Sequence, residues 1–162
     1  MKLYCKTISV FLDLSAAFDI VWHQKLIHIC YNTVIKGNEL IWNSDFLRDR
    51  KFSVRFNGGL SESHKLRAGV PQESVLSPLL FLIYMNTIHP HIHHGMKIAW
   101  YADYIAVWHS HIDTAVSEKV INATFEGIAA WAEDFKLTIN ADKINYWVFL
   151  TTDDIMAFLM RP

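Results

Sequence analysis

Two short apolar runs, each leading into an aspartate, constrain the fold of this chain more than any other feature. The run ISVFLD ends at Asp13, and the run KIAWYADYIAVW places Asp103 between two apolar arms. A carboxylate at the end of a buried strand is costly unless a cation or hydrogen bonds compensate its charge. Two such strands side by side would present hard oxygen ligands to a shared Mg²⁺. Aspartate is also common in turns, so each residue alone could be an ordinary turn residue.

The order of the expected elements predicts an α+β fold. The β-branched and aromatic run 7–13 predicts a strand buried on both faces, and 145–150 predicts a closing strand. Helical spacing predicts helices over 22–35, 39–48, 74–88 and 114–135, the third ended by His89-Pro90. Asn57-Gly58-Gly59 predicts a hairpin between 52–56 and 64–67, and 98–108 predicts another with residues 102–104 at its tip. The side chains expected to point inward from the second and third helices are Leu40, Ile41, Phe46, Leu47, Leu76, Leu79, Leu80, Leu82 and Ile83.

Composition predicts a globular protein. The 162 residues are 52% hydrophobic and 19% charged, which suits one domain with a workable core. Cys5 and Cys30 form no metal or disulfide pattern, so we expect reduced, buried thiols in an intracellular protein, cytoplasmic or nuclear. The start MKLYCKT has no signal-peptide core, and the longest apolar stretch is too short to span a bilayer and contains Pro78. The sequence gives no indication of oligomeric state.

Four motifs occur in a fixed order: FLDLSAAFDIVWH, GVPQESVLSPLLFLIYMN, WYADY and KLTINADKINYWVF. Together they resemble the palm of a reverse transcriptase, with the greatest likeness to non-LTR (LINE-type) retrotransposon polymerases. The resemblance extends over roughly residues 7 to 150. It implies a ferredoxin-like antiparallel sheet packed on helices, with the palm domain over 1–150 and an unassigned tail over 151–162. It also implies that the fingers and thumb of such a polymerase lie outside this chain.

The resemblance implies an RNA-directed DNA polymerase whose partners are an RNA template, a DNA primer and deoxynucleotides. Asp13, Asp103 and the backbone carbonyl of Leu14 would then hold two Mg²⁺ ions. Lys143 matches a lysine that protonates the leaving pyrophosphate or binds phosphates in related polymerases. An exposed, solvated lysine is an equally good interpretation of Lys143.

Two departures from the family pattern predict little or no activity. Tyr104 stands where a third carboxylate is expected, and a phenol is a poor magnesium ligand at neutral pH. Glu73 stands where the family has a glycine, adding bulk and negative charge beside expected phosphates. Tyr104 could instead point away and leave Asp103 to act alone, and Glu73 could favour the first turn of the next helix.

Further residues carry interpretations on substrate binding. Phe18 matches an aromatic steric gate against ribonucleotides, although it could be a core phenylalanine. Gly69, Pro71 and Gln72 resemble the loop that lies against template and incoming nucleotide. We read Asp19 as structural, capping or charge-pairing near the following helix.

Basic and imidazole side chains gather in two other segments. The basic residues Arg48, Arg50, Lys51 and Arg55, with Lys65 and Arg67, are interleaved with Phe52 and Phe56, a pattern typical of a nucleic-acid surface or of a solvated charged face. The loop HPHIHH, holding His89, His91, His93 and His94, is a weak metal-site candidate because it lacks a fixed geometry. The alternative function is a non-catalytic remnant or a module that binds RNA or a partner protein.

Overall fold

The computed structural model describes residues 5–33, 35–72 and 74–149. The chain divides into two compact units, one formed by Met1–Ser15 with Ile88–Pro162 and the other by Ala16–Thr87. Each unit has its own sheet or hairpins and its own buried side chains.

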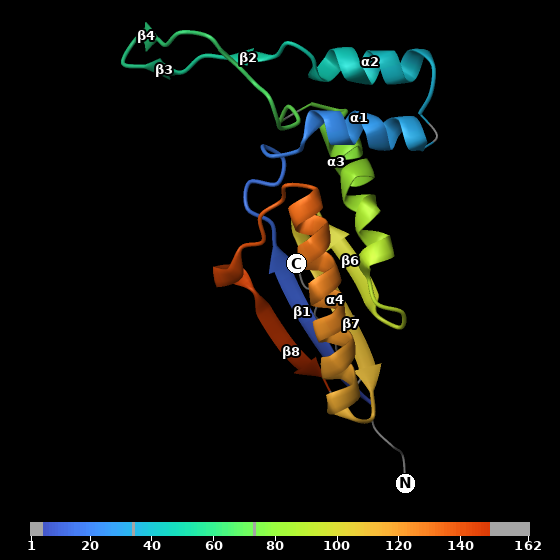
Figure 1. Ribbon diagram of the computed structural model, residues 1–162. Coiled ribbons are helices and arrows are strands. Elements are labelled where there is room, and N and C mark those ends of the chain that lie inside the picture. The colour runs from blue at the N-terminus through green and yellow to red at the C-terminus, as the bar shows by residue number, and fades with distance from the viewer. Residues whose placement is uncertain (1–4, 34, 73, 150–162) are drawn as a thin grey trace. The chain divides into compact units, whose positions relative to one another are not determined.

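The first unit is built around a four-stranded antiparallel sheet (Figure 1). Its strands are β1 (Lys6–Asp13), β6 (Lys97–Tyr101), β7 (Tyr104–His111) and β8 (Asn145–Phe149), in the order β6-β7-β1-β8. Helix α4 (Thr114–Asp134) connects β7 to β8, and the short 3₁₀ helix η2 (Ala141–Lys143) precedes β8. The β6–β7 hairpin lies at one side of the sheet, β1 pairs with β7, and β8 forms the opposite edge. This order is the ferredoxin-like arrangement. The predicted α+β palm fold is thus present.

Register and burial distinguish the two faces of this sheet. Val10 lies opposite Val107, and Leu12 lies opposite Ile105; all four are buried beneath α4. Because side chains alternate along a strand, the intervening residues point to the other face. That second face carries Phe11, Asp13, Tyr104 and Ala106. The first aspartate therefore lies on the sheet face opposite the helix.

The second unit holds helices α1 (His23–Asn32), α2 (Asn38–Leu47) and α3 (Ser77–Met85). Between α2 and α3 the chain makes two nested hairpins. The inner one pairs β3 (Arg55–Phe56) with β4 (Gly59–Leu60), and the outer one pairs β2 (Lys51–Phe52) with β5 (His64–Lys65). Asn57 and Gly58 have φ of 47° and 81°, the left-handed pair that a two-residue turn requires. The hairpin predicted from Asn-Gly is confirmed, with the nested pairing as an addition.

Several expectations about boundaries and burial were wrong. The helix expected over 74–88 begins at Ser77, with Pro78 in its first turn, and the chain continues after Met85 as the 3₁₀ helix η1 (Asn86–His91). Pro90 lies inside η1 rather than ending an α-helix. The expected hairpin tip is shorter, since Tyr104 is the first residue of β7. The side chains expected inside but found exposed are Ile41, Leu79, Leu82 and Cys5.

Candidate functional site

The ends of β1 and of the β6–β7 hairpin meet at one edge of the first unit. Asp13 is the register partner of Tyr104. The backbone N–H of Leu14 donates to the carbonyl of Asp103 at 3.1 Å. Ala102, with φ of 52°, and Asp103 form the turn between the two hairpin strands. The two aspartates expected to share a site therefore come from adjacent strand ends, although they lie 90 positions apart in the chain.

Asp13 is buried, and its charge is compensated by this chain's own side chains. Its carboxylate is 4% exposed, and Oδ2 lies 3.1 Å from Nζ of Lys143. Asn140 Nδ2 donates to the same oxygen at 3.4 Å. The hydrogen bond to Asp13 and the charge of that carboxylate raise the pKa of Lys143, with smaller contributions from Tyr104 and Asp103. Lys143 is therefore ion-paired with Asp13, while 57% of its side chain is exposed, as the interpretation of an exposed lysine expected.

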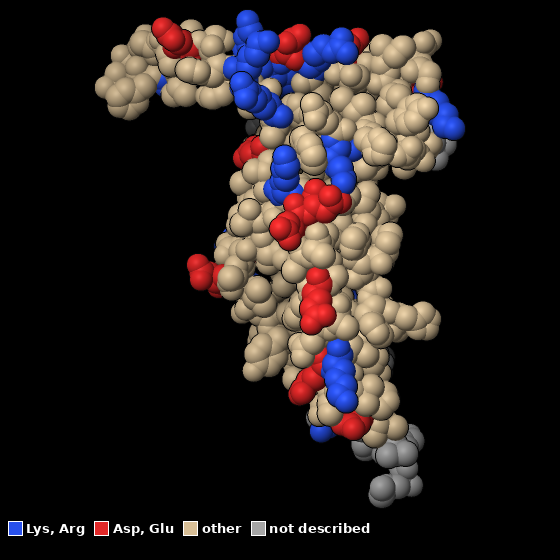
Figure 2. All heavy atoms as spheres, viewed as in Figure 1, with Lys and Arg blue, Asp and Glu red and all other residues tan. Residues whose placement is uncertain are grey.

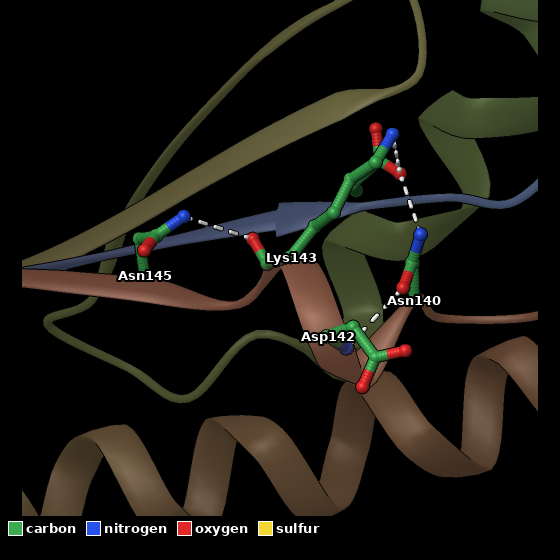
Figure 3. Close-up of polar contacts among 5 residues, drawn as sticks. Asn140, Asp142, Lys143 and Asn145 are labelled. Atoms are coloured by element: carbon green, nitrogen blue, oxygen red, sulfur yellow. Dashed lines mark hydrogen bonds and ion pairs between the residues drawn. The ribbon is translucent and has the colours of Figure 1, made fainter.

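Figure 3 shows how the segment before β8 holds these two donors. Asn140 N–H donates to the carbonyl of Asp13 at 2.8 Å, and Leu14 and Ile139 form an isolated bridge. The Asn140 side chain also accepts from the N–H of Asp142 at 3.2 Å, which caps η2. The sequence alone did not single out Asn140 as a site residue. Its contact with Asp13 spans 127 positions, and no local pattern reveals it.

Tyr104, at the position where the resemblance led us to expect a carboxylate, lies beside Asp13 as its register partner. Its side chain is half exposed and lines a shallow apolar hollow of about 280 Å³ together with Phe11 and Tyr101. Hard cations take oxygen ligands, and an apolar wall offers none. Within the described residues, no three His, Cys, Asp or Glu side chains come together as a metal-binding group.

The second unit contains the residues assigned to substrate binding. Phe18 stacks on Phe81 with ring centroids 4.2 Å apart. This contact agrees with the interpretation of Phe18 as a packing residue and does not test its interpretation as a steric gate. Gln72 Nε2 donates to Asp19 Oδ1 at 2.9 Å. Asp19 thus has the structural role that was one of the expected alternatives, by pairing with the loop. It does not cap the following helix, since α1 has no side-chain cap.

Gly69 is required by the fold itself. Its φ is +88°, and a Cβ there would lie 2.7 Å from the carbonyl oxygen of Asp19. Pro71 and Gln72 follow it along the rim of a surface hollow of about 260 Å³. Arg50 lies on the same rim, so one cation of the basic cluster adjoins the loop. Glu73 lies outside the described residues.

The basic cluster is exposed and partly ion-paired. Figure 2 shows Lys and Arg side chains gathered over the region that α2 and β2 occupy in Figure 1. Arg48 pairs with Asp45 at 3.4 Å and Lys65 with Asp49 at 3.3 Å, while Arg50 lies over the Phe46 ring. Lys51, Arg55 and Arg67 are exposed.

The histidine loop uses its side chains in local contacts. His89 packs edge-on against Trp100, with ring centroids 5.0 Å apart. Nδ1 of His93 lies 2.8 Å from the carbonyl oxygen of His94. These contacts account for two of the four histidines without a metal.

Comparison with known proteins identifies the family. The family model described as "Reverse transcriptase (RNA-dependent DNA polymerase)" matches residues 2–159. The "Probable RNA-directed DNA polymerase from transposon BS" of Drosophila melanogaster is 33% identical over 155 residues, covering 88% of this chain and 16% of that protein. The RNA-directed DNA polymerase from mobile element jockey of the same fly is 31% identical over 142 residues, covering 84% of this chain and 15% of that protein.

Solved structures agree on the fold. The apo telomerase from Candida tropicalis, truncated from its C-terminal domain, superposes with a TM-score of 0.66 at 12% identity. The match covers 89% of this chain and 31% of that one. At such low identity the likeness supports the fold alone.

The sheet, the paired strand ends and the family match define a reverse transcriptase palm. The chain belongs to the reverse transcriptase family, and the expectation of a polymerase fragment of the non-LTR retrotransposon type is confirmed. It spans about one sixth of the length of the curated relatives that it matches. No helix within the described residues is both long and apolar enough to cross a membrane.

Proposed function

We propose that this chain derives from the nucleotidyl-transfer centre of a retrotransposon RNA-directed DNA polymerase and that it has little or no polymerase activity as it stands. In this proposal Asp13, Asp103 and the carbonyl of Leu14 occupy the metal-binding positions. The RNA template, DNA primer and deoxynucleotide are the substrates that the intact polymerase would use. The observation that carries the proposal is the pairing of Asp13 with Tyr104 at adjacent strand ends.

The donor set does not fit a two-magnesium site. Bound magnesium would activate a primer hydroxyl and neutralise the leaving pyrophosphate. The chain supplies two carboxylates and one carbonyl, and Tyr104 replaces the third carboxylate. Asp13 already accepts contacts from Lys143 and Asn140. Losing one metal carboxylate costs on the order of several kcal/mol of transition-state stabilisation, which corresponds to at least about a hundredfold in rate.

Primer extension in a chimera tests this proposal. In the chimera, the segment of the jockey polymerase that matches over 142 residues is replaced by the corresponding segment of this chain. The jockey protein supplies the rest of the polymerase. With Mg²⁺ or Mn²⁺ on an RNA template, we expect extension at least about a hundredfold below that of the unmodified jockey polymerase. Restoring the family residues by Tyr104→Asp and Glu73→Gly should recover synthesis.

Comparable rates of primer extension by the chimera with the unsubstituted segment and by the unmodified jockey polymerase would contradict the proposal. Failure of the doubly substituted chimera, despite folding, would favour the non-catalytic remnant. The domain division into a palm over 1–150 and a separate tail remains part of the proposal.

The exposed basic cluster supports a second candidate, an RNA-binding module. Cations that contact phosphates release counter-ions, so each lost contact lowers the salt dependence of binding. Substituting Arg48, Arg50 and Lys51 by Gln should reduce the slope of log K against log salt by about 2 for a single strand. The matched control substitutes Lys6, Lys97 and Lys119, which removes the same charge from exposed positions of the other unit. Equal effects of the two triple variants would reject the cluster as the binding surface.

A further inference from the structure

Asp13 presents a physical problem that the chain solves with its own residues. An ionised carboxylate that is 4% exposed is stable only if its charge is neutralised and its oxygens accept hydrogen bonds. Lys143 Nζ at 3.1 Å supplies the charge, and Asn140 Nδ2 at 3.4 Å supplies a further donor to the same oxygen. The charge of Asp13 is therefore compensated without a metal, through two contacts to Oδ2.

The position of Lys143 is fixed by several backbone contacts. Its carbonyl accepts from Asn145 Nδ2 at 3.2 Å (Figure 3). Its N–H donates to the carbonyl of Asn140 at 3.2 Å. Asn140 is in turn tied to the backbone of Asp13 at 2.8 Å. These contacts place the backbone of Lys143 at the end of η2, from which its side chain, 57% exposed, reaches Asp13.

We propose that the Lys143 ammonium is a built-in counter-ion that takes the place of a divalent cation at Asp13. This proposal rests on the proposed function, in which Asp13 and Asp103 derive from a metal-binding pair. An ammonium and a divalent ion compete for the lone pairs of Asp13 Oδ2. The chain therefore folds without metal and binds divalent cations weakly at this carboxylate. Tyr104 favours the lysine over a divalent cation at Asp13. With tyrosine in place of a third carboxylate, the site has one negative charge fewer and attracts a divalent cation less strongly.

Mn²⁺ binding to the full 162-residue chain tests the proposal, with free Mn²⁺ measured by electron paramagnetic resonance at constant ionic strength. Lys143→Met should bind Mn²⁺ at least about tenfold more tightly than the natural chain. The corresponding free energy lies between the values typical of exposed and of buried ion pairs. Lys119→Met, which removes an exposed lysine of α4, is the matched control and should leave the affinity within about twofold. Adding Asp13→Asn to Lys143→Met should abolish the gain.

Thermal unfolding gives a second measurement that does not depend on activity. Without metal, Lys143→Met should melt below the natural chain, and Mn²⁺ should raise its melting temperature more than it raises that of the natural chain. If Lys143→Met does not fold without metal, Lys143→Gln, which retains a hydrogen-bond donor, is measured in its place.

The outcomes separate the two proposals. Equal Mn²⁺ affinities of the natural chain and the Lys143 variant overturn the counter-ion proposal. The double variant Tyr104→Asp, Lys143→Met is then decisive for the proposed function. If it binds Mn²⁺ tightly through Asp13, the metal-binding ancestry holds and only the counter-ion role fails. If it does not bind, the metal-binding assignment of Asp13 and Asp103 fails as well.

Discussion

Gly127 offers a sharp test of how the first unit is packed. It lies within α4, and a Cβ built there would come 2.1 Å from the backbone carbonyl oxygen of His91. Since real Cβ atoms essentially never approach closer than 3.0 Å, the helix and the His91 backbone would have to separate by about 0.9 Å. Ile88, in the same 3₁₀ segment as His91, is fully buried, so that segment cannot move without disturbing the core.

The two contributions to Gly127→Ala have opposite signs. Alanine favours a helix over glycine by about 1 kcal/mol. Overpacking against a backbone atom costs about 1–3 kcal/mol, and the size of this overlap places it near the upper end. We therefore expect a net loss of about 2 kcal/mol, or roughly 4–8 °C in melting temperature for a chain of this size.

Circular dichroism melting, with hydrogen exchange of residues 114–134, measures the effect on α4. The control is Ala129→Gly, at an exposed position of the same helix, which should cost about 1 kcal/mol from propensity alone. A Gly127→Ala variant more stable than the natural chain would show that the close approach of His91 does not exist, and would refute the reasoning.

Three other measurements follow from single contacts. Burial, and then the charges of His111 and His93, lower the pKa of His109, whose Nδ1 lies 2.9 Å from Ser117 Oγ. The unfolded chain therefore binds this proton more readily, so stability should fall as pH drops through about 6.5, and His109→Gln should reduce that loss in urea titrations at pH 7.5 and 5.5. Burial raises the pKa of Cys30, whereas Cys5 is exposed. Iodoacetamide should therefore label Cys5 of the native chain first, and equal labelling rates of the two cysteines in mass spectrometry would contradict this expectation. Asn140→Ala removes the cap of η2 and a donor to Asp13, so urea unfolding should show a loss of about 1 kcal/mol, and an unchanged midpoint would reject the contact.

Local patterns in the sequence were sufficient for much of the fold. The β-branched run before Asp13, the Asn57-Gly58 turn and the periodicity of α4 each depend on neighbouring residues, and each element was predicted. Exposure was harder to predict. Leu79 and Leu82 are apolar residues on an apolar helix, and only the packing of α3 shows that they are exposed.

The sequence by itself determined the family and the order of the elements along the chain, since these follow from short motifs in a fixed order, and it singled out Asp13 and Asp103 as candidate site residues. It also determined that Tyr104 stands where a carboxylate is expected. The tertiary structure alone decided what compensates Asp13. That outcome depends on contacts between residues 127 and 130 positions apart, made when β8 pairs with β1 and places Asn140 and Lys143 beside the carboxylate. A buried charge needs a partner, but which partner it finds is a matter of three-dimensional proximity that residue types and spacing do not encode.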